Sequence, residues 1–151
     1  MISRRTFLAG AVLLGATTSA MGQGTEVSPI ELKVGDNMRY TPSVIRAHPG
    51  QRVRIVLKGV GKIAPLGHNF VLLKKGVAPK AFVEKAAKAT EDTGSIPTAM
   101  NDQVIVATAL VKPGESAEVT FEAPREPGEY TFACSVPGHF GLGMKGQLIV
   151  K

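Results

Sequence analysis

Short segments in which apolar and polar residues alternate recur along most of the chain. Such alternation is typical of β-strands that bury one face, because successive side chains point to opposite sides of a strand. Glycine and proline separate these segments, as Pro49 and Gly50 do. The pattern predicts strands at residues 30–35, 44–46, 53–57, 68–76, 103–111, 116–124, 128–134 and 146–151.

One segment has the period of a helix instead. Residues 79–90, PKAFVEKAAKAT, begin with proline and place Phe82, Ala86 and Ala89 on one helical stripe. We expect the residues from Gly94 to Asp102 to form a loop. Seven or eight short strands with one inserted helix predict an all-β fold, an antiparallel Greek-key β-sandwich or barrel.

The N-terminus follows neither period. MISRRTFLAGAVLLGATTSA contains a pair of arginines, a short apolar run and small residues before a cleavage position after Ala20, as secretory signal peptides do. SRRTFL resembles twin-arginine export signals, although a pair of basic residues also suits general secretion. We therefore expect residues 1–20 to be a signal peptide, residues 21–30 a flexible segment, residues 31–151 one domain, and the protein to be exported.

Composition argues against several classes of function. The formal charge of the 151-residue chain is +6, and it becomes +4 without residues 1–20, which contain two arginines and no acidic residue. This surplus is small, the lysines are scattered without interleaved aromatic residues, and there is no nucleic-acid-binding motif, so we expect no nucleic-acid partner. No Ser-His-Asp set or paired-carboxylate motif indicates an enzyme. Beyond the N-terminus, no apolar run approaches the roughly 20 residues of a membrane span.

Candidate chemistry gathers in one loop near the C-terminus. CSVPGHFGLGM, residues 134–144, holds the single cysteine of the chain, one of its three histidines and one of its five methionines. A lone cysteine is most often an apolar core residue. One cysteine is too few for an iron–sulfur cluster, and no CxxC or HxxxH pair supports a zinc site. Two histidines and a cysteine with a weak axial methionine are typical of blue-copper electron-transfer sites.

A site of that kind needs a second histidine besides His139, and the chain offers two. His48 lies in a polar turn, so we expect it at the surface. His68 follows Gly67 and precedes an apolar strand, which favours burial. His68 is therefore the better candidate, although it lies 66 residues before Cys134, and the fold must bring the two together.

Three longer segments resemble the type 1 copper proteins azurin and auracyanin, which have the cupredoxin fold. They are GHNFVLL, VIVATALVKPGESAEVTF and YTFACSVPGHFGLGMKGQLIVK, and the likeness covers residues 31–151. The resemblance implies a single copper ion. The implied equatorial ligands are His68, Cys134 and His139, and the implied axial ligand is Met144.

The same resemblance implies a role for two residues beside His68. The carbonyl of Gly67 would be a distant further contact of the copper ion, and Asn69 would join the two ligand segments by hydrogen bonds, with its amide toward the cysteine sulfur. Two features depart from azurin. The spacing between His139 and Met144 is one residue longer, as in auracyanin and plastocyanin, and there is no second cysteine for the disulfide of azurin.

The implied function is electron transfer in the periplasm by copper that cycles between Cu(I) and Cu(II). A periplasmic copper carrier or storage protein is the alternative. Copper nitrite reductases and multicopper oxidases contain related domains, but their additional copper centres need more than three histidines. The implied partners are redox proteins, such as a c-type cytochrome or a copper or haem enzyme, that dock near His139. The apolar patch expected there consists of Leu66, Val136, Pro137, Phe140 and Leu142.

Overall fold

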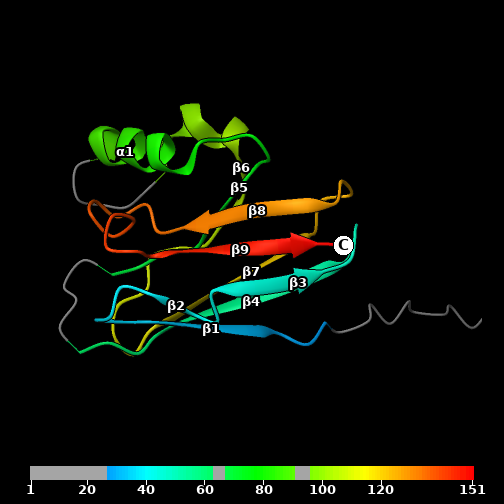
Figure 1. Cartoon of the computed structure of the whole chain (residues 1–151). Coiled ribbons are helices and arrows are strands. Elements are labelled where there is room, and N and C mark those ends of the chain that lie inside the picture. Colours follow the sequence, from blue (N-terminus) through cyan, green and yellow to red (C-terminus); the bar gives the residue numbers. More distant parts are fainter. Residues whose placement is uncertain (1–26, 63–66, 91–95) are drawn as a thin grey trace, which may run out of the picture.

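Two β-sheets pack face to face in the computed structural model, and one helix covers the outer side of the second sheet (Figure 1). The structure describes residues 27–62, 67–90 and 96–151. The expected signal peptide lies outside these residues. Within the described part of the chain, no helix is long and apolar enough to cross a membrane.

The first sheet has four strands and the second has five. In spatial order, the first sheet contains β2 (Tyr40–Thr41), β1 (Ile30–Val34), β4 (Arg52–Gly59) and β7 (Ser116–Glu122). In spatial order, the second sheet contains β3 (Val44–Ala47), β9 (Lys145–Val150), β8 (Gly128–Ala133), β5 (Val71–Leu73) and β6 (Val104–Ala107).

The expected β-sandwich with one helix is confirmed, but its sheets are mixed rather than antiparallel throughout. β1 pairs with β4 in parallel, and so does β3 with β9. The physical reason is a change of sheet: β3 and β4 follow each other along the chain, yet they belong to different sheets, so the turn between them does not close a hairpin. The alternation of apolar and polar residues shows which face of a strand is buried. It does not show which other strand lies beside it in the sheet.

Several elements differ from the sequence prediction, and the short strand β2 was not predicted at all. The segment expected to be a loop contains a 3-10 helix, η1 (Thr98–Gln103), which buries Met100. The strands expected at 68–76 and 103–111 are shorter. Beyond them, the Thr108 N–H donates to the Phe70 carbonyl at 2.9 Å, and an isolated antiparallel bridge joins His68 to Val111. The backbone around His68 therefore lies outside the regular strand β5.

The core lies between the sheets and is built from the inward-facing residues of both. Its fully buried members include Leu32, Ile55, Leu57, Phe132 and Leu148. β5 is buried on both faces, which explains its uninterrupted VLL sequence.

A second, smaller cluster lies between β5 and the helix. Helix α1 (Pro79–Thr90) is the one predicted at 79–90, and it packs Phe82, Val83 and Ala86 against this outer face of the sheet. The side chain of Ala89 lies outside the described part of the helix. The helix therefore supports the end of the sheet from which the loop 134–144 begins, because Ala133 and Phe140 belong to the same cluster.

Candidate metal centre

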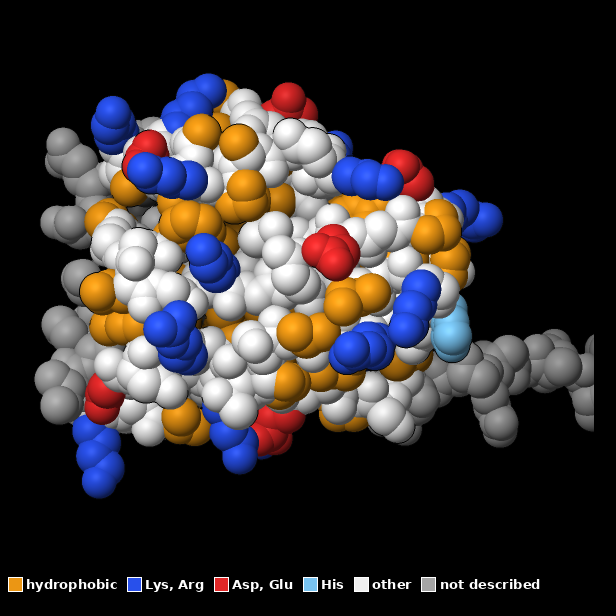
Figure 2. Space-filling model, viewed as in Figure 1, with side chains coloured by type: hydrophobic (Ala, Val, Ile, Leu, Met, Phe, Trp, Pro, Cys, Tyr) orange, Lys and Arg blue, Asp and Glu red, His pale blue; other side chains and the backbone are white. Residues whose placement is uncertain are grey.

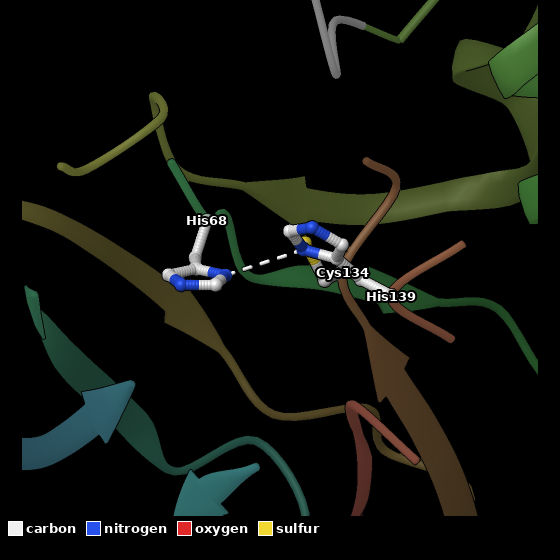
Figure 3. A group of neighbouring side chains, drawn as sticks. All are labelled: His68, Cys134 and His139. Atoms are coloured by element: carbon white, nitrogen blue, oxygen red, sulfur yellow. Dashed lines mark hydrogen bonds between the residues drawn. The ribbon is translucent and has the colours of Figure 1, made fainter. Parts of the chain in front are cut away.

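Three donor side chains from two distant parts of the chain meet at one end of the sandwich (Figure 3). His68, Cys134 and His139 place one ligand atom each within 4.8 Å of the others. The two Nδ1 atoms are 3.3 Å apart, and the Cys134 sulfur lies 3.5 Å from Nδ1 of His139. His48 is elsewhere on the surface, where its Nδ1 lies 3.0 Å from the carbonyl oxygen of Lys151.

A short backbone bridge places His68. The N–H of His68 donates to the Val111 carbonyl at 2.9 Å, and the N–H of Val111 donates to the His68 carbonyl at 2.7 Å. Gly67 has a φ of 68°, and a Cβ there would lie 3.0 Å from the Val111 carbonyl oxygen. Only glycine combines this left-handed conformation with such a close approach at little cost.

The loop between β8 and β9 brings its donors back to the end of β8. Met144 donates its N–H to the His139 carbonyl at 3.0 Å, and Cys134 donates its N–H to the Met144 carbonyl at 3.2 Å. The loop is thereby closed on itself before β9 begins. Met144 is fully buried in the same core cluster as Cys134.

Hydrogen bonds join the His68 segment to the Cys134 loop. The side chain of Asn69 donates from Nδ2 to Oγ of Ser135 at 2.8 Å and accepts from the Ser135 N–H at Oδ1, at 3.0 Å. The main-chain N–H groups of Asn69 and Val136 donate to the Cys134 sulfur. The side-chain amide of Asn69 therefore binds the neighbour of the cysteine, whereas its backbone amide faces the sulfur.

Burial controls the protonation of the three donors. It lowers the pKa of His68 to about 4, with His139 as a further cause, and it also lowers the pKa of His139. Both imidazoles are consequently neutral near pH 7. Burial raises the pKa of Cys134 to about 11, and the two main-chain N–H donors oppose this increase only in part. The metal-free protein thus holds a thiol, whose proton a metal ion must displace.

The spacing of the donors fits a trigonal metal ion. First-row metals bind imidazole nitrogen at about 2.0 Å and thiolate at about 2.3 Å. In a trigonal plane, these bond lengths place the nitrogens about 3.5 Å apart and each nitrogen about 3.7 Å from the sulfur. Two of the three separations, 3.3 Å and 3.5 Å, are close to these values, and the donor atoms of His68 and Cys134 lie within 4.8 Å of each other. Two neutral imidazoles and one sulfur therefore converge on a point that suits a single cation.

Sequence reasoning missed several residues that support the centre. Ser135 binds Asn69, the Thr108 hydroxyl accepts the Phe70 N–H at 3.0 Å, and Arg39 and Tyr40 contact the ligand segments. These contacts join residues that are 29 to 104 positions apart in sequence. No local motif could have indicated them, because each depends on how the sheets are arranged.

The bonds between Asn69 and Ser135 generate a stability prediction. Asn69→Ala removes both and should lower the free energy of unfolding of the metal-free protein by about 2 kcal/mol. Ser135→Ala keeps the backbone bond to Asn69 and should cost about half as much. Chemical denaturation of both variants measures the free energy of unfolding. Equal stability of Asn69→Ala and the wild type would show that the hydrogen bonds between Asn69 and Ser135 do not stabilise the protein.

Comparison with known proteins also points to a copper-binding protein with this fold. A family model described as copper-binding proteins of the plastocyanin/azurin family matches residues 28–151. A crystal structure of reduced auracyanin from Roseiflexus castenholzii superimposes with a TM-score of 0.72 at 31% identity and covers 83% of this chain and 98% of that chain.

Curated relatives include proteins of three kinds. Auracyanin-B of Chloroflexus aurantiacus is 40% identical over 83 residues, which are 55% of this chain and 35% of that protein. Azurin of Bordetella pertussis is 33% identical over 92% of this chain and 93% of azurin. The copper-resistant cuproprotein CopI of Pseudomonas aeruginosa is 29% identical over 100% of this chain and 99% of CopI. With one copper site formed around His68, Cys134 and His139, the chain belongs to the plastocyanin/azurin family of copper-binding proteins.

Proposed function

We propose that this protein is a periplasmic electron carrier. The supporting observation is a closed donor set, since His68, Cys134 and His139 are 1%, 0% and 5% exposed. Bound copper supplies a one-electron couple between Cu(I) and Cu(II). A ligand set that is buried and held by hydrogen bonds limits rearrangement between the two oxidation states, and this limit favours fast electron transfer.

The roles of the individual residues follow from their donor atoms. The Nδ1 atoms of His68 and His139 and the thiolate of Cys134 would hold the copper ion. The Met144 thioether would be a further, weaker ligand, and the Gly67 carbonyl would be a more distant contact. The N–H donors to the Cys134 sulfur stabilise its thiolate form.

The surface around the ligand loop supports docking of a redox partner. Residues 134–144 contain no charged side chain, and Leu142 is 60% exposed. A partner such as a c-type cytochrome or a copper or haem enzyme can approach His139 over this apolar area. On the side of the molecule where β8 and β9 run, Figure 2 shows hydrophobic side chains lying between those of lysines and arginines.

The patch differs in composition from the sequence expectation. Val136 is 1% exposed and belongs to the core, because the neighbouring Ser135 is bound to Asn69 in the interior. Phe140 is half-buried against the cluster beneath helix α1. Leu66 lies outside the described residues. Pro137 and Leu142 remain as the accessible apolar side chains of the loop.

Export and the lack of an enzymatic role are part of the same proposal. The paired arginines and apolar run of residues 1–20 support transfer to the periplasm. Relatives named azurin and auracyanin support electron transfer rather than catalysis.

One observation favours the alternative of a copper carrier or storage protein. CopI, a copper-resistant cuproprotein, aligns over the whole chain. A protein that hands over copper is expected to have an open site, whereas the described donors are buried. We therefore prefer electron transfer and keep copper delivery as the second candidate.

Copper loading tests the site directly. Addition of Cu(II) to the purified metal-free protein should give an intense blue thiolate charge-transfer band and a narrow copper hyperfine splitting in electron paramagnetic resonance. Cys134→Ser should abolish the band, and His48→Ala, the matched histidine outside the site, should leave it unchanged. A colourless copper-loaded protein would contradict the assignment.

Replacement of Met144 tests the axial role. Met144→Leu removes a donor that stabilises Cu(II) more than Cu(I), so the reduction potential should rise by about 60 mV for each tenfold loss of that preference. Met100→Leu changes a methionine buried in the other cluster and should leave the potential unchanged. Voltammetry measures both, and an unchanged or lowered potential in Met144→Leu would count against axial ligation.

A charge in the docking area separates the two candidate functions. Leu142→Lys should slow electron self-exchange about tenfold, because like charges then face each other when two copies meet. Thr120→Lys places the same charge on the exposed side of β7 and serves as the control. Slow self-exchange in the wild type, together with rapid transfer of copper to a chelator, would instead support the copper carrier.

A further inference from the structure

We propose that residues 38–40, named the 38–40 clamp, hold both ligand-bearing segments in position through the side chains of Arg39 and Tyr40. The clamp contacts the backbone beside His68 and the backbone beside Met144. Both side chains donate to main-chain carbonyls rather than to the proposed ligand atoms, so both are positioning residues. The role of the clamp in holding copper ligands rests on the proposed copper site. The contacts of Arg39 and Tyr40 are observed in the structure and do not depend on that proposal.

The Arg39 side chain fixes the end of the ligand loop. Its Nη1 donates to the Gly143 carbonyl at 3.2 Å, directly before Met144. Gly143 has a φ of 101°, and a Cβ at this position would overlap the same Nη1 atom. The guanidinium therefore lies against the face of Gly143 that any side chain would occupy. The Lys145 N–H donates to the same carbonyl at 2.9 Å, so this oxygen is held from two sides.

The Tyr40 side chain fixes the other segment. Its hydroxyl donates to the Asn69 carbonyl at 2.5 Å, one residue after His68. The ring is 3% exposed and meets the Phe132 ring edge-on, with centroids 5.1 Å apart and planes at 79°. Phe132 lies on β8, two residues before Cys134. Tyr40 thus touches the His68 segment with its hydroxyl and the Cys134 strand with its ring.

The turn before β2 directs these two neighbours to different targets. Tyr40 pairs with Val34 of β1, and successive side chains of an extended segment point to opposite sides. Met38 adopts a φ of 52° and donates its N–H to the Gly35 carbonyl at 3.0 Å. A non-glycine residue rarely occupies this left-handed region, and such strain persists where the surrounding structure requires it. The Asn37 side chain accepts the Arg39 N–H at 3.2 Å and completes the turn.

The clamp acts together with the two hydrogen bonds between Asn69 and Ser135. These two hydrogen bonds connect the His68 segment directly to the Cys134 loop. The clamp connects each of them to a third element, which is anchored in the first sheet through the pairing of β1 and β2. The His68 segment and the Met144 end of the loop are consequently fixed relative to one another before any metal binds.

Amide hydrogen exchange of the metal-free protein tests the clamp. In Arg39→Ala, the Gly143 and Met144 amides should exchange about fivefold faster, whereas the His68 amide should keep its rate. In Tyr40→Phe, which keeps the ring, the His68 and Phe70 amides should exchange about tenfold faster, because the buried Asn69 carbonyl loses its donor. The two variants thereby report on the two side chains separately.

Matched variants exclude a general loss of stability. Arg39→Lys can still donate to the Gly143 carbonyl and should restore slow exchange in the loop. Arg52→Ala removes an exposed arginine at the start of β4 and should change neither segment. Wild-type exchange rates in Arg39→Ala and Tyr40→Phe, or equal acceleration throughout β9, would overturn the clamp. Because no copper is present, this result is independent of whether the copper assignment holds.

Discussion

The burial of two imidazoles and one thiol around a single point is the constraint on which the rest of the structure depends. Neutral nitrogen atoms 3.3 Å apart and a thiol with a raised pKa form an arrangement that water would otherwise solvate. In the metal-free protein the donors contact one another only through the ring nitrogens of the two histidines and through the Cys134 sulfur and His139, among the described residues. The surrounding structure must therefore fix the position of each donor residue, and the hydrogen bonds of the neighbouring backbone and side chains do so.

These supports come from different elements. The bridge between His68 and Val111 places the first histidine, the bonds within the 134–144 loop place the second, and β8 delivers the cysteine from the core. Asn69 then connects the two segments through Ser135. Such a preorganised site changes little when a copper ion changes its charge, and this rigidity links the packing of the sandwich to the proposed electron transfer. The same closure opposes rapid delivery of copper, although the likeness to CopI keeps that alternative in view.

The sequence predicted the fold class and the three residues that meet in the structure, His68, Cys134 and His139, and it failed where neighbours in space are distant in sequence. Most strands and helix α1 followed from periodicity, because most of these elements bury one face, whereas β2 was not predicted and β5 is buried on both faces. The parallel pairs β1–β4 and β3–β9 could not be predicted, since alternation carries no information on the neighbouring strand. Val136 was expected in the surface patch because the family resemblance implies apolar residues around His139, yet its side chain is buried and the neighbouring Ser135 is hydrogen-bonded to Asn69.

By itself, the sequence determined the chemistry: which residues can donate to a metal, and that three of them lie in one short loop. Those features are local, because residue type and loop spacing are written in consecutive positions. The tertiary structure decided that His68 rather than His48 faces Cys134 and His139, and that Arg39 and Tyr40 contact the ligand segments. Contacts of this kind arise only when two sheets pack, since their distances depend on the path of the whole chain between the partners.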